Sequence, residues 1–137
     1  MIDARDPVIS VCPKLIKLNG IALLISPMNA NGRHCSMIGF NEELASLDNT
    51  AVLCVSADLP YAQKRFCGSE GLDRVKTAST FRSTFSDDYG VTVLTGIRRG
   101  LTARVVVVID PAGIVKHVEL VEEVSTEPDY EAALAVL

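Results

Sequence analysis

Residues Ala51 to Gly71 read A-V-L-C-V-S-A-D-L-P-Y-A-Q-K-R-F-C-G-S-E-G. The apolar run at the start predicts a strand that ends in the polar step Ser56 to Asp58. Pro60 is typical of the first turn of a helix, so a helix is expected to run from it towards Cys67. One cysteine, Cys54, therefore falls inside a strand, and a second, Cys67, falls near the end of a helix.

Outward from this stretch, the chain alternates predicted strands and helices, with an ambiguous polar segment over 77–85. Strands are expected at Ile21–Ser26, Ala51–Val55, Leu101–Ile109 and Ile114–Val121, and helices at Cys35–Leu47, Pro60–Cys67 and Asp129–Val136. The last two strands flank a turn that contains Pro111 and Gly113, which predicts a hairpin. This order of elements predicts an α/β thioredoxin-like fold, with a central mixed sheet flanked by helices.

Length and composition agree with a single domain over residues 1–137. A chain of this size buries a substantial core, and 48% of its residues are hydrophobic. No apolar run is long enough for a membrane span, and residues 1–7 lack the pattern of a signal peptide, so a cytoplasmic location is expected. The net charge of -4 gives no basic surface for nucleic acid.

The four cysteines do not suggest a disulfide framework or a metal site. The chain contains no C-x-x-C, and its two histidines, His34 and His117, lie far apart in the sequence. The spacing of these residues fits neither a zinc ribbon nor a thioredoxin-type redox pair.

Several segments, taken in order, resemble the thiol peroxidase family, the atypical two-cysteine peroxiredoxins. They are F-N-E-E-L-A-S-L-D-N-T from Phe40, R-F-C-G around Cys67, S-T-F-R from Ser79, G-L-T-A-R-V-V-V-V-I-D from Gly100 and E-P-D-Y-E-A-A-L from Glu127. The resemblance implies a peroxiredoxin fold and a thiol-dependent peroxidase that reduces hydrogen peroxide and organic hydroperoxides. It also implies thioredoxin as the reductant and a homodimer as the assembly. No cofactor is required, because sulfur carries out the redox chemistry.

The resemblance also assigns roles to three residues. Cys67 matches the resolving cysteine, and Arg104 matches the active-site arginine. Cys35 stands just before the predicted helix that Phe40 continues, and it is the candidate peroxidatic cysteine. A free thiol has a pKa of about 8.5, and a helix N-terminus together with a guanidinium favours the reactive thiolate. The predicted cycle passes through a sulfenic acid on Cys35 and a Cys35–Cys67 disulfide.

The match is weaker before Phe40. Pro27 and Cys35 are separated by one residue more than in the family, and Gly32 stands where the family has a threonine. The family's leading hairpin and first strand have no counterpart, so the N-terminal strands are expected to be truncated. These departures leave two alternatives open: a degenerate peroxiredoxin scaffold without turnover, or a thiol redox sensor.

The remaining two cysteines have no assigned chemistry. Cys54 is interpreted as a small core residue, because free cysteine packs well inside strands. Cys12 has no family counterpart and is interpreted as a structural or incidental thiol.

Overall fold

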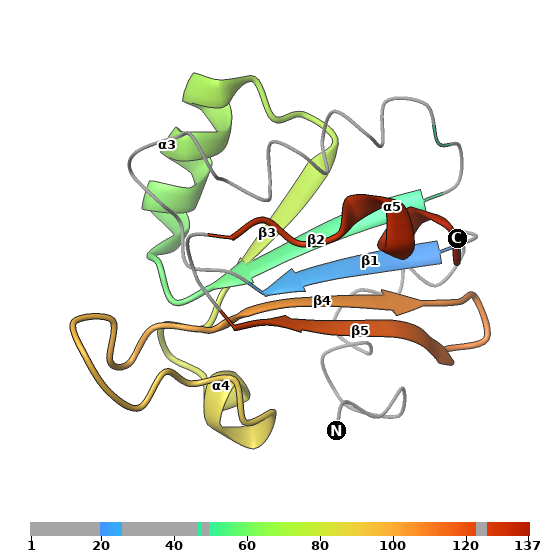
Figure 1. Cartoon of the computed structure of the whole chain (residues 1–137). Coiled ribbons are helices and arrows are strands. Elements are labelled where there is room, and N and C mark those ends of the chain that lie inside the picture. Colours follow the sequence, from blue (N-terminus) through green and yellow to red (C-terminus); the bar gives the residue numbers. More distant parts are fainter. Residues whose placement is uncertain (1–19, 26–46, 48–49, 123–125) are drawn as a thin grey trace.

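The computed structural model describes residues 20–25 as backbone and residues 47, 50–122 and 126–137 in full. Within them, one sheet has the strand order β3-β2-β1-β4-β5 (Figure 1). The strands are β1 (Gly20–Ile25), β2 (Thr50–Ser56), β3 (Val75–Ser79), β4 (Arg104–Ile109) and β5 (Val115–Val121). β1 runs parallel to β2 and antiparallel to β4, while β3 is parallel to β2 and β5 antiparallel to β4. The prediction that the first, second and fourth of these strands share one sheet is confirmed.

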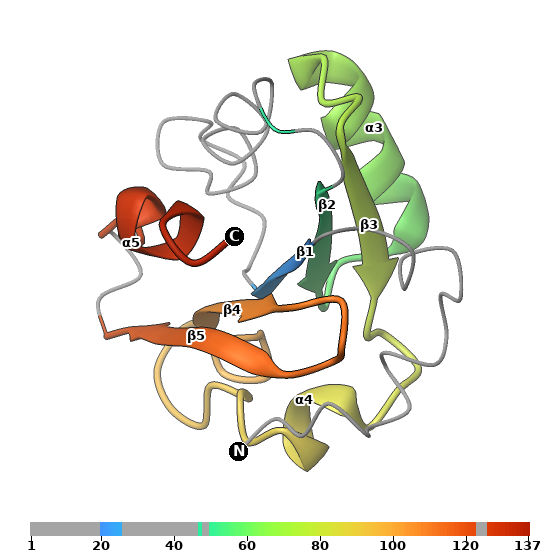
Figure 2. The same cartoon turned by 90° about the vertical axis from the view of Figure 1, so that its right-hand side faces the viewer.

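Helices cover both faces of this sheet. Figure 2 shows α3 (Pro60–Glu70) and α5 (Tyr130–Leu134) on one face and the short α4 (Phe85–Asp88) on the other. Because both faces are covered, β4 consists of consecutive buried residues instead of alternating buried and exposed ones. Its Val106 and Val108 pack under α3 and α5, whereas Val105 and Val107 pack with the α4 side. The five β-branched residues of β4 therefore belong to two cores that the sheet separates.

The β4–β5 hairpin is closed by the predicted turn. The Asp110 carboxylate accepts hydrogen bonds from the backbone N–H groups of Ala112 and Ile114, each at 2.9 Å. Gly113 has φ 83°, a left-handed conformation that glycine adopts at low cost. These bonds, with that of Lys116 to the carboxylate at 3.3 Å, lower the pKa of Asp110 below its ordinary value; the bond from Ile114 contributes most.

The structure extends some predicted elements and shortens others. Helix α3 continues to Glu70, because Gly71 takes the left-handed conformation that ends a helix. Helix α5 is shorter than predicted, and the ambiguous segment overlaps the end of β3 and a turn leading to α4. The helix expected at Cys35–Leu47 and the truncated N-terminal strands lie outside the described residues, apart from Leu47.

Candidate functional site

The candidate site lies at one edge of the sheet, where the parallel strands β1, β2 and β3 end. The antiparallel strand β4 begins at this edge, because Ile25 at the end of β1 pairs with Val105. Arg104 precedes Val105 and therefore stands beside the end of β1. Ligands of open α/β sheets commonly bind at the carboxyl ends of parallel strands. Arg104, one of the three predicted site residues, therefore lies at this edge, where ligands commonly bind.

Arg104 is a buried cation at this edge. Its side chain is 1% exposed, and its Nη1 donates a short hydrogen bond to the backbone carbonyl of Thr126. A buried guanidinium is costly unless it is hydrogen-bonded and faces negative charge, so its position is unusual for a residue with only a packing role. Side chains alternate along a strand, and Arg104 therefore shares the face of Val106, which is covered by α3 and α5.

The segment that carries Thr126 is held in place from β5. The backbone N–H of Asp129 donates to the Glu119 carboxylate at 3.0 Å. Asp129 in turn caps α5, since its carboxylate accepts a hydrogen bond from the backbone N–H of Ala132 at 2.9 Å. These two bonds fix Asp129 at the start of α5, three residues after the Thr126 carbonyl that accepts from Arg104.

Cys67 lies on α3, on the same side of the sheet as Arg104. It is half-buried and packs with Phe66 against the core cluster that contains Val106. The structure thus brings Arg104 and Cys67 to one side of the sheet. Cys35 lies outside the described residues, so its role stays a prediction.

A polar network secures the start of α3 at the same edge. Ser56 Oγ, at the end of β2, accepts from the backbone N–H of Asp58 at 3.3 Å and from Gln63 Nε2 at 2.9 Å. The Ser79 hydroxyl, at the end of β3, donates to the backbone carbonyl of Asp58. Gln63 was not among the predicted site residues. Its spacing of three and four residues from Phe66 and Cys67, on the inner face of the helix, is the signal that identifies it.

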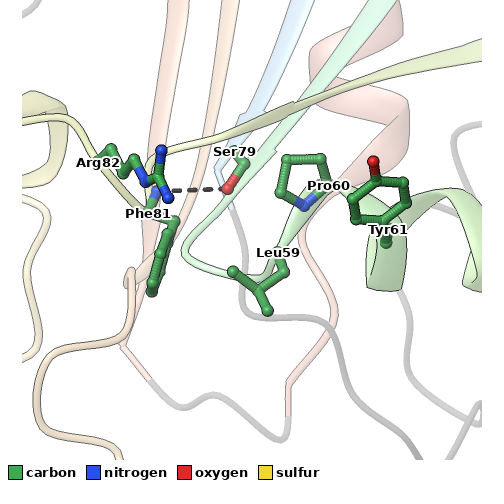
Figure 3. Close-up of a pocket in the computed structure, with 6 residues that line it drawn as sticks. All are labelled: Leu59, Pro60, Tyr61, Ser79, Phe81 and Arg82. Carbon is green, nitrogen blue, oxygen red and sulfur yellow. Dashed lines mark hydrogen bonds between the residues drawn. The ribbon is translucent and has the colours of Figure 1, made fainter.

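A cleft of about 360 Å³ opens beside this network (Figure 3). It is lined by Leu59, Pro60, Tyr61, Ser79, Phe81 and Arg82. Leu59, Tyr61 and Phe81 are exposed, and the Phe81 backbone N–H donates to Ser79 Oγ at 3.3 Å. The sequence motif S-T-F-R thus supplies one wall of a largely apolar surface at the site, a feature that sequence reasoning did not predict.

Neither Cys54 nor Cys12 is assigned to the candidate site. Cys54 is 4% exposed within β2, in agreement with the predicted core position. Cys12 lies outside the described residues. Among the described residues, no three His, Cys, Asp or Glu side chains are grouped as metal ligands would be. No helix within the same residues is long and apolar enough to cross a membrane.

Comparison with known proteins defines the class of protein. Residues 30–134 match the sequence profile of the Redoxin family. Because this match covers well over half of the chain, the chain belongs to the Redoxin family.

Individual relatives narrow the comparison to thiol peroxidases. The chain is 54% identical over 98 residues to a thiol peroxidase from Corynebacterium glutamicum, a match that covers 72% of this chain and 59% of that protein. It is 55% identical over 96 residues to a thiol peroxidase from Mycobacterium bovis, covering 70% of this chain and 58% of that protein. The matched region thus spans less than two thirds of these relatives. The resemblance to thiol peroxidases inferred from the sequence is confirmed.

Solved structures support the fold. A peroxiredoxin-like protein from Aquifex aeolicus is 38% identical, with a TM-score of 0.76, covering 85% of this chain and 70% of that chain. A thiol peroxidase from Chromobacterium violaceum is 18% identical, with a TM-score of 0.79, covering 89% of this chain and 72% of that chain. The predicted thioredoxin-like fold of the peroxiredoxins is therefore confirmed.

Proposed function

We propose that this chain is a thiol-dependent peroxidase that reduces hydrogen peroxide and organic hydroperoxides. Its relatives named thiol peroxidases support this activity. The structural observation that carries the proposal is the placement of a buried arginine, Arg104, on the same side of the sheet as the half-buried side chain of Cys67. Neither the relatives nor the described residues favour the scaffold or sensor alternative.

In the proposed first step, the Cys35 thiolate attacks one oxygen of the hydroperoxide. The O–O bond breaks, and the other oxygen leaves and takes up a proton as water or an alcohol, so that the peroxide is reduced by two electrons. Cys35 is oxidised to a sulfenic acid. The Arg104 guanidinium favours the thiolate over the thiol, because a nearby positive charge stabilises the anion.

In the second step, the sulfur of Cys67 attacks the sulfenic sulfur of Cys35. The S–O bond breaks, the S–S bond forms, and the oxygen leaves as water. A disulfide holds its two Cα atoms within about 6 Å of each other, and in the proposed cycle part of α3 unwinds to present Cys67 to Cys35. Reduced thioredoxin then supplies two electrons, returns both cysteines to thiols and becomes oxidised itself.

The proposal includes a cytoplasmic location and a homodimer. The cycle needs a compartment in which a dithiol reductant is kept reduced, which fits the cytoplasm. The exposed apolar side chains of Leu59, Tyr61 and Phe81 at the cleft support a dimer contact at this edge, since contiguous apolar patches often mark protein interfaces.

Peroxide consumption by cysteine variants tests this function. We expect Cys35→Ser to abolish thioredoxin-dependent peroxide consumption, and Cys67→Ser to leave a sulfenic acid on Cys35 that dimedone traps. Cys54→Ala serves as the matched control, because it removes a thiol from the core without removing a proposed redox partner. Loss of peroxide consumption in Cys54→Ala with full activity in Cys67→Ser would overturn the proposed roles.

A further inference from the structure

Gln63 is a buried polar residue that ties the first half of α3 to the sheet. Its side chain is 2% exposed, and Nε2 donates to Ser56 Oγ on β2 and to the backbone carbonyl of Ala78 on β3, each at 2.9 Å. Both N–H groups of the amide are thus used, and each binds a different strand. Breaking these bonds would leave buried polar groups unsatisfied, which costs more than the net value of the bonds.

Other hydrogen bonds reinforce the same end of the helix. The Gln63 backbone N–H donates to the carbonyl of Leu59 at 3.0 Å, and Asp58 is bonded to both Ser56 and Ser79. Pro60 at the helix start already has a backbone angle suited to a helix. The start of α3 is therefore fixed by side chains from two strands.

The second half of α3 is held more weakly. Gly68 lies inside the helix, where glycine is unfavourable, and a Cβ built on it has no heavy atom within 4 Å. The Ser69 hydroxyl donates to the carbonyl of Phe66 at 2.9 Å, a local bond that competes for a carbonyl of the helix. Residues 68–70 are exposed. This half is held by the packing of Phe66 and Cys67 and by the N–H groups of Gly71 and Leu72, which donate to the Cys67 carbonyl just past the helix end.

We infer that Gln63 is a positioning residue that sets where α3 stops unwinding when Cys67 is released. In an α-helix each N–H bonds to the carbonyl four residues earlier. Opening from the C-terminus up to and including the bond accepted by the Gln63 carbonyl breaks the bonds of the N–H groups of residues 67–71 and keeps those of residues 63–66. Cys67 is thereby freed on a short tether whose other end stays fixed to β2 and β3. This inference rests on the proposed function, because the release of Cys67 serves the reaction only if it is the resolving thiol.

Site-resolved hydrogen exchange on the reduced, full-length chain tests the boundary directly. In the wild type we expect the N–H groups of residues 67–70 to exchange at least about tenfold faster than those of residues 64–66. Gln63→Met, which keeps the side-chain length and removes the bonds, should reduce the protection of residues 64–66 about tenfold. Lys64→Met is the matched control on the exposed face of the same turn, and it should leave the pattern unchanged. Ser56→Ala removes one of the two acceptors and should give a smaller loss in the same amides.

Two further readouts separate positioning from general destabilisation. Alkylation of Cys67 in Gln63→Met should stay near the wild-type rate, because the half of the helix that carries it already opens in the wild type. Exchange in β2 and β4 should also stay unchanged. A single protection level across residues 63–70 in the wild type would overturn the inference, as would equal loss of protection in α3, β2 and β4 in Gln63→Met. None of these measurements uses peroxide, so failure of the proposed peroxidase activity would be seen separately, in the Cys35→Ser assay.

Discussion

Replacing Gly68 with alanine should slow the formation of the Cys35–Cys67 disulfide without slowing the attack on peroxide. Gly68 lies in the interior of α3, and an added Cβ has no heavy atom within 4 Å, so alanine fits without steric conflict. Alanine stabilises a helix interior by about 1 kcal/mol relative to glycine. If the helix must open to release Cys67, the open population falls about fivefold, because 1.4 kcal/mol corresponds to a factor of ten.

Rapid-quench kinetics with dimedone trapping separates the two steps. In Gly68→Ala, the sulfenic acid on Cys35 should form at the wild-type rate and then disappear about fivefold more slowly. Gly71→Ala is the matched control of opposite sign, since Gly71 has φ 66° and a side chain there strains the end of the helix. It should speed the disappearance. The reasoning is refuted if both variants change this second step in the same direction, or if Gly68→Ala slows sulfenic acid formation instead.

Three further predictions concern the charge, the hairpin turn and the apolar surface. Arg104→Met should raise the pKa of Cys35, which is measured as the pH dependence of Cys35 alkylation. Each unit of pKa corresponds to about 1.4 kcal/mol of lost thiolate stabilisation. An unchanged pH profile would contradict the role of the guanidinium. The lowered pKa of Asp110 stabilises the folded chain at pH values above 3.8, the ordinary pKa of this group, and the stabilisation is lost as the pH falls through the pKa in the folded state. In Asp110→Asn, the free energy of unfolding measured with urea should therefore depend less on pH across that acidic range. Phe81→Glu should shift a sedimentation profile from dimer to monomer, whereas Ile114→Glu, at a similarly exposed apolar residue on the hairpin, should not.

Most of the described sheet was predictable because its signals are local. Five consecutive β-branched residues define β4, and the Pro111–Gly113 turn defines the hairpin that β5 completes. Strand β3 was missed because V-K-T-A-S is short and partly polar, and it pairs with β2 at an edge of the sheet. Its position depends on tertiary pairing that no local pattern specifies.

The site was predictable only in part, for a similar reason. Arg104 and Cys67 both stood out through the match of their neighbourhoods to the thiol peroxidase family. The tie from Gln63 to Ser56 and Ala78 joins residues 7 and 15 positions apart in the sequence, so it becomes visible only when β2, β3 and α3 are assembled. The cleft is also formed by side chains from two separate segments.

Peptide mapping by mass spectrometry after one equivalent of hydrogen peroxide tests the central claim most directly. We expect two thiols to be consumed and a single disulfide to join Cys35 to Cys67, with Cys54 and Cys12 still alkylatable after denaturation. Formation of this disulfide should be far faster than the oxidation of a free thiol under the same conditions. Oxidation of Cys35 no faster than a free thiol, or a disulfide that excludes Cys67, would contradict the account.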